Sequence, residues 1–148
     1  MKLNHRKTTV TFWLLFIVGI FLILQFSVFN ELLSGPIFLL PIAIFFILGG
    51  LLTYFTFKEK IKGKLKKFFL LTGISALGFF ACIILHNFFY ALAEISGGII
   101  ILPYLMEFLH AAFFLIGIIV CPLGYLVGLI GSFVLILKGG KKWRTKLD

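Results

Sequence analysis

Apolar residues occur along the chain in four long blocks that are separated by short polar segments. The blocks run roughly over residues 10–29, 36–57, 68–92 and 108–137. As an α-helix with a rise of about 1.5 Å per residue, each block is long enough to cross about 30 Å of hydrocarbon. The remaining segments are too short for a separate soluble domain. The pattern therefore predicts an all-α fold, a four-span transmembrane helical bundle that forms one integral membrane domain over residues 1–148.

The boundary before the fourth block is open to two interpretations. In the first, residues 99–109 form a short interfacial helix in the second outer loop, with Pro103 near its start. In the second, an irregular loop precedes a fourth span that begins near Leu109. A re-entrant segment is a third option.

The first block follows the basic segment "MKLNHRKTTV", which resembles the charged start of a signal peptide. Its apolar stretch is about 20 residues long, whereas the apolar region of a signal peptide has about 7 to 15. The end of the block, "LQFSVFNELL", offers no small-x-small cleavage site. We therefore expect the first span to remain as a signal anchor.

Positive charge is confined to three segments. Of the 14 Lys and Arg residues, three precede the first block, six lie between the second and third, and five follow the fourth. The other two loops contain glutamates instead. Since Lys and Arg concentrate in cytoplasmic loops, both termini and the "KEKIKGKLKK" loop are predicted to be cytoplasmic, in a multi-pass protein of the cell (cytoplasmic) membrane.

The composition, 61% hydrophobic with a net charge of +9, changes how this basic character is interpreted. In a soluble protein, clustered Lys and Arg would suggest nucleic-acid binding. Here the charges lie at the ends of the spans, without the interleaved aromatic residues of a single-strand binding groove. We therefore expect contact with anionic headgroups on the cytoplasmic side of the lipid bilayer, and no nucleic acid.

Small residues mark the helix faces that are expected to pack, because association within lipid relies on close backbone approach. At 100° per residue, one line along the fourth span carries five of them: Gly117, Cys121, Gly124, Gly128 and Ser132. Gly124 and Gly128 form a GxxxG motif. This face predicts a homo-oligomer or a membrane-protein partner. Pro122 is expected to loosen or kink the helix beside it.

Polar residues gather toward the outer ends of the third and fourth spans. His86 and Tyr90 share the small-residue face of the third span, and Glu94 follows, while Glu107 and His110 have i, i+3 spacing before the fourth. We expect His86 and His110 to face one another across the two helices. Three further polar residues occur at the same level: Gln25, Asn30 and Glu31.

This outer cluster has three possible roles. Two imidazoles and two carboxylates would suffice as Zn²⁺ ligands, so a metal site is possible. In the second interpretation, the groups hydrogen-bond one another at the wet headgroup level. In the third, they form a proton-linked or polar-substrate path, because histidine titrates near neutral pH.

No catalytic motif accompanies the four spans. HExxH, GxSxG and phosphate-binding glycine loops are all absent from the sequence, and we expect no cofactor. Cys82 and Cys121 have no CxxC spacing and are interpreted as small buried residues. The chain therefore suggests a non-catalytic accessory, regulatory or immunity-like membrane component. The alternatives are a small transporter or channel that uses the outer cluster and a membrane-embedded metalloenzyme.

Overall fold

The computed structural model describes residues 6–27, 39–95 and 101–144, and these residues are almost entirely helical. The helices are α1 (Arg6–Ser27), α2 (Leu39–Lys58), α3 (Gly63–Ile95), α4 (Ile101–Leu115) and α5 (Cys121–Arg144). A π-helical segment, η2 (Ile116–Val120), joins α4 to α5. Four helical stretches are long and apolar enough to cross a membrane, so the predicted all-α, four-span bundle is confirmed.

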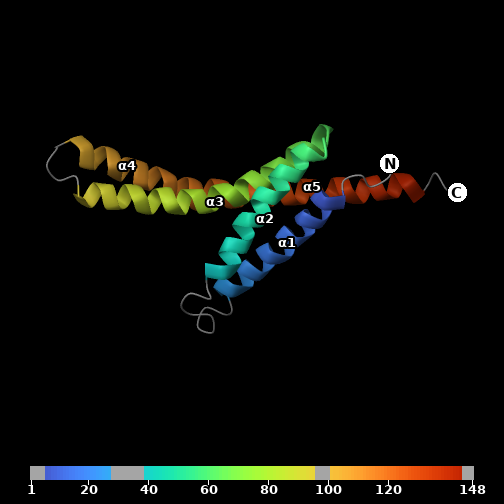
Figure 1. Cartoon of the computed structure of the whole chain (residues 1–148), viewed down its shortest axis with the longest axis horizontal. Coiled ribbons are helices and arrows are strands. Elements are labelled where there is room, and N and C mark those ends of the chain that lie inside the picture. Colours follow the sequence, from blue (N-terminus) through green and yellow to red (C-terminus); the bar gives the residue numbers. More distant parts are fainter. Residues whose placement is uncertain (1–5, 28–38, 96–100, 145–148) are drawn as a thin grey trace.

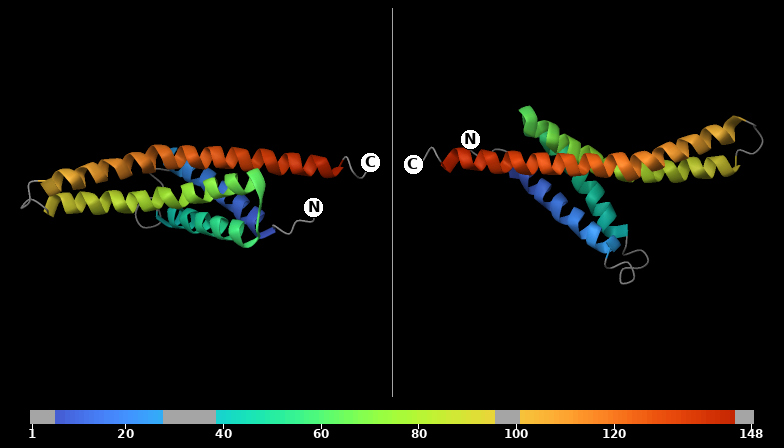
Figure 2. Two further views of the ribbon diagram at one scale, coloured as in Figure 1. Left: turned by 90° about the horizontal axis from the view of Figure 1, so that it is seen from above. Right: turned by 180° about the vertical axis from the view of Figure 1, so that it is seen from behind.

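The helices form two antiparallel pairs that cross one another (Figure 1). One pair is α1 with α2, and the other is α3 with the continuous α4–η2–α5 helix. The start of α1, the α2–α3 connection and the end of α5 lie toward the same end of the molecule, which we call the basic end. At the other end, residues 83–95 of α3 and α4 extend beyond the first pair as a two-helix unit, the distal hairpin (Figure 2).

The two pairs meet where α2 crosses α3. A Cβ atom added at Gly49 would lie 2.8 Å from the Ala76 Cβ, and one added at Gly73 would lie 2.9 Å from the Gly49 carbonyl oxygen. Only glycine permits this backbone approach. A hydrophobic core surrounds the crossing and reaches the basic end, where Ile61 of the α2–α3 connection is 3% exposed. The close contact between α2 and α3 is therefore part of the hydrophobic core.

Several helices extend beyond the predicted spans at their basic ends. α1 begins at Arg6, and α3 begins at Gly63. Lys and Arg are favourable helix residues, and their long side chains can carry the charge to the membrane surface while the backbone stays helical. Residues 28–29 and 36–38 of the predicted spans lie outside the described residues.

Neither main interpretation of the second outer loop is correct. From Ile101 onward the chain is helical without interruption through Arg144, so there is neither a separate interfacial helix nor an irregular loop before Leu109. Pro103 is the third residue of α4, where its missing N–H group interrupts no intrahelical hydrogen bond. The fourth span and the expected interfacial helix are parts of one long helix.

The helix loosens at the predicted place, directly before Pro122. Cys121 donates its backbone N–H to the carbonyl oxygen of Ile116, which is an i→i−5 hydrogen bond. Pro122 itself has no N–H group to offer to the carbonyl of Ile118. The wider π turn is the local response of the helix in this segment.

Candidate functional site

The two histidines of the predicted outer cluster lie against each other between α3 and α4. The His86 and His110 ring centroids are 4.0 Å apart, and the ring planes are inclined by 24°. The Nδ1 atom of each ring lies 3.2 Å from the backbone carbonyl oxygen of the other histidine. The histidines thus form a reciprocal pair that joins the two helices.

These contacts indicate that Nδ1 carries a hydrogen in both rings. A carbonyl oxygen can only accept a hydrogen bond, so Nδ1 is the donor in both rings, and in a neutral imidazole Nε2 is then unprotonated. Because the rings stack face to face, the lone pair of each Nε2 lies in the plane of its own ring and is not directed at the other ring. The geometry suits an interhelical connection better than a shared metal ion.

Of the other predicted members of the cluster, only Tyr90 joins the pair. Its ring centroid lies 5.2 Å from that of His110. Glu94 and Glu107 are exposed, on α3 and α4 respectively. Within the described ranges, no three His, Cys, Asp or Glu side chains are grouped so that they could hold a metal ion. Gln25 is fully buried in α1, and Asn30 and Glu31 lie outside the described residues.

Other aromatic rings extend the contact on both sides of the histidine pair. The His86 ring lies 5.1 Å from the Phe114 ring. Phe89 and Phe113 stack with centroids 5.5 Å apart and planes inclined by 5°. Stacked and tilted rings therefore make much of the side-chain contact between the two helices of the distal hairpin.

The predicted small-residue face of the fourth span lies against α3 of the same chain. A Cβ atom at Gly128 would lie 2.6 Å from the Thr72 backbone nitrogen, and one at Gly117 would lie 3.1 Å from the Cys82 Cβ. Gly124 lies against Ser75. Cys121 and Ser132 are also buried. In the described residues α3 of the same chain occupies this face, and the expected homo-oligomer or membrane-protein partner stays a prediction.

The two cysteines lie in the same interface. Both are buried and free: the Cys121 Sγ lies beside Gly78 of α3, and the Cys82 Cβ lies beside Gly117 of η2. No spacing in the sequence indicates that they lie close together, since the two residues belong to different helices. Their burial agrees with the interpretation of both as small packing residues.

Glu59, in the connection between α2 and α3, is an interaction site that the sequence interpretation missed. Its carboxylate accepts hydrogen bonds from the backbone N–H groups of Lys7 (3.2 Å) and Thr8 (3.3 Å), and from the Thr8 hydroxyl (2.6 Å). These N–H groups belong to the first turn of α1, where they have no intrahelical partner. The carboxylate thus caps α1 and lies at the positive end of its dipole.

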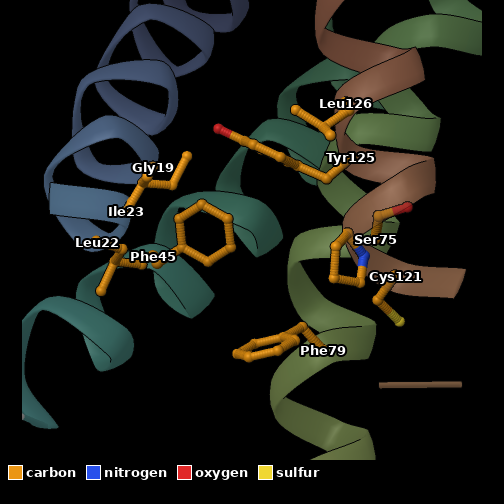
Figure 3. A pocket seen from close by; sticks show the side chains of 10 residues that line it. Gly19, Leu22, Ile23, Phe45, Ser75, Phe79, Cys121, Tyr125 and Leu126 are labelled. Atoms are coloured by element: carbon orange, nitrogen blue, oxygen red, sulfur yellow. The ribbon is translucent and has the colours of Figure 1, made fainter. Parts of the chain in front are cut away.

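A cavity of about 350 Å³ lies between the two helix pairs (Figure 3). All four long helices contribute to its lining: Gly19, Leu22, Ile23, Phe45, Ser75, Phe79, Cys121, Pro122, Tyr125 and Leu126. The Tyr125 hydroxyl donates a hydrogen bond to the Leu15 carbonyl oxygen at 3.1 Å, so this polar group already has a partner. The cavity is therefore an apolar space within the membrane-spanning part of the protein.

Comparisons of the chain with protein-family models, with curated proteins and with solved structures give no match. The arrangement of the residues described above is therefore the basis for inferring a function.

Proposed function

We propose that the protein is a non-catalytic accessory or regulatory component of a cytoplasmic membrane, in the class that also includes immunity-like membrane proteins. One observation carries the proposal: the two histidines of the outer cluster join α3 to α4. Both histidine Nδ1 atoms bond to the carbonyl of the partner histidine, and both rings stack. A site for chemistry or transport would leave these groups directed toward a substrate.

The apolar interior supports the same proposal over the alternative of a small transporter or channel for polar solutes. A conducting path needs polar or charged groups that replace the hydration shell of the solute. The cavity between the helix pairs instead presents mainly aliphatic and aromatic side chains. A small transporter remains the alternative, and the flux measurement described below distinguishes it from the accessory component.

Partner binding belongs on the distal hairpin in this proposal, since α3 occupies the small-residue face of the fourth span. On α4, Tyr104 and Phe108 are 72% and 68% exposed. Aromatic side chains of this kind are enriched in the cores of interfaces. The partner would be a second copy of this chain or another membrane protein.

Site-specific photo-cross-linking in native membranes, combined with flux measurements, tests the proposal. A photoreactive phenylalanine analogue at Phe108 should give a discrete protein adduct, whereas the same analogue at the exposed Ile17 of α1 should give none. Purified protein in liposomes should pass Na⁺, K⁺ and protons no faster than empty liposomes. Two results together would contradict this proposal and favour a transporter: a flux that His110→Ala abolishes, and no protein adduct at Phe108.

The proposed orientation places the basic end in the cytoplasm, next to anionic headgroups. Exposed lysines gather there on the α2–α3 connection and the first turn of α3: Lys60, Lys62, Lys64 and Lys67. Each lysine near an anionic surface contributes about 1 kcal/mol of attraction. A reporter that is active only outside the cytoplasm should be active when fused after Gly97 and inactive when fused after Gly63 or Asp148. Activity after Asp148 would contradict the orientation.

A further inference from the structure

The cavity between the helix pairs owes its shape to the way in which the pairs cross. α2 and α3 approach most closely at Gly49 and Gly73. Away from this contact the pairs diverge (Figure 1), and the space toward the distal end of α1 and α2 is filled only in part by side chains. The cavity is thus a wedge between two packed units.

Aromatic residues close the wedge on the side of the basic end. Figure 3 shows the Tyr125 ring extending from α5 toward α1, with Phe45 beside it. The two rings pack edge to face, with centroids 5.2 Å apart. The Tyr125 hydroxyl is bonded to the Leu15 carbonyl, one helical turn nearer to the start of α1 than Gly19. The cavity therefore has a floor whose polar atom is already satisfied.

Part of the cavity wall also belongs to the outer surface of the bundle. Ile23 of α1 and Leu126 of α5 line the cavity and are 60% and 46% exposed, so they belong both to its wall and to the outer surface. At this depth the surroundings of a spanning helix are the acyl chains of the bilayer. Entry is therefore lateral, from lipid.

The depth of the floor matches the reach of an acyl chain. Gly19 lies eight residues before the distal end of α1 at Ser27, which corresponds to about 12 Å along the helix. One leaflet contributes about 15 Å, half of the roughly 30 Å hydrocarbon thickness. A lipid whose headgroup lies level with the distal end of α1 can therefore place the part of one chain near its methyl end against Tyr125.

We propose that this cavity is a binding site for one acyl chain of a phospholipid from the leaflet at the distal end of α1 and α2. Its volume of about 350 Å³ falls within the range of ligand sites, roughly 300 to 1,000 Å³. A bound chain would contact Cys121 and Pro122, which directly follow the π segment. The site does not depend on the accessory role proposed above.

A photoreactive phospholipid tests the site. Full-length protein is reconstituted in phosphatidylcholine and phosphatidylglycerol vesicles that contain a phospholipid with a diazirine near the methyl end of one acyl chain. After photolysis, peptide mass spectrometry should locate adducts on Phe79 and Leu126 several-fold above those on Ile118, which is 53% exposed and outside the cavity. Adducts in simple proportion to exposure would overturn the proposal, since they indicate boundary lipid only.

A filled cavity provides the matched control. Leu22→Trp places a bulky ring in the space, so the adducts on Phe79 and Leu126 should fall several-fold. Ile17→Trp, on the outward side of α1, should leave them unchanged. Ile23→Trp at the mouth of the cavity is a second variant that disturbs the core less, in case Leu22→Trp does not fold. Unchanged labelling in a folded cavity-filling variant would contradict the proposal.

Discussion

α3 packs along the continuous α4–η2–α5 helix, and the basic half of this pair (α3 with α5) packs differently from the distal half (α3 with α4). In the basic half, glycines bring the backbones together, as at Gly128 against Thr72. In the distal half, the described residues of α3 and α4 that face each other include no glycine. Their contact is made by rings, such as His86 on His110. The first half is also covered by α1 and α2, whereas the distal hairpin extends past them (Figure 2).

The difference shows how helix association works without water. In lipid, packing depends on contact surface and on interhelical hydrogen bonds, because hydrocarbon is as apolar as a leucine side chain. Glycine contacts provide surface but tolerate no added atom. Ring stacks provide contact through side chains that can adapt, and the histidine pair adds hydrogen bonds. Stability should therefore depend mainly on side-chain volume in the basic half, and on hydrogen-bonding side chains in the distal half.

The largest expected effect is that of Gly128→Leu in the basic half. Its Cβ would lie 2.6 Å from the Thr72 nitrogen and 3.0 Å from the Phe68 carbonyl oxygen, which are backbone atoms that cannot rotate away. We expect a loss of about 3 kcal/mol or more in the free energy of unfolding. Thermal unfolding in detergent measures it, with Ile130→Leu on the exposed face as a control that changes little. If the two variants were equally stable, close contact between the α3 and α5 backbones at Gly128 would not contribute to stability.

A smaller loss is expected from Glu59→Gln at the basic end. The amide keeps the shape of the side chain but lacks the charge that lies at the start of α1, and it offers one acceptor oxygen where the carboxylate has two. We expect a cost of about 1 to 2 kcal/mol, the range of a lost helix cap. Lys62→Gln, in the same connection and exposed, is the control. If both variants unfold at the same temperature as the parent, the cap contributes no stability.

The smallest effect should come from the distal hairpin, with His86→Phe and His110→Phe. Phenylalanine preserves the ring stack but removes one interhelical hydrogen bond each time, at a cost of about 1 kcal/mol. Because the two bonds are reciprocal, we expect the double variant to cost less than the sum of the single ones. A double-mutant cycle by thermal unfolding measures this coupling. Strict additivity would mean that the two histidines act independently.

Much of this fold could be predicted because its causes are local. Block length specifies the four spans, and the glycine line on the fourth span identifies the face that packs. The partner of that face could not be read from sequence, since intramolecular and intermolecular packing use the same small residues. The continuous helix before Leu109 was also missed: Pro103 suggests a boundary until its position in the first turn is known.

The site was predicted in part for a similar reason. His86 and His110 each lie on a predictable helix face and follow one another through a single connection, so their contact was expected. Glu94 and Glu107 share the neighbourhood in sequence but are exposed in the structure. The Glu59 cap joins residues more than 50 positions apart, and no periodic pattern indicates such a contact.

The π segment sets the rotational phase between the two halves of the longest helix. A π turn holds about one residue more than an α turn, and one residue corresponds to a rotation of about 100°. If Ile116–Val120 adopted α-helical hydrogen bonding, α4 would turn by about that amount relative to α5. His110 would then leave the line of His86 while Gly128 kept its contact with Thr72. The hydrogen-bonding pattern of these five residues therefore decides whether both ends of the long helix can contact α3 at the same time.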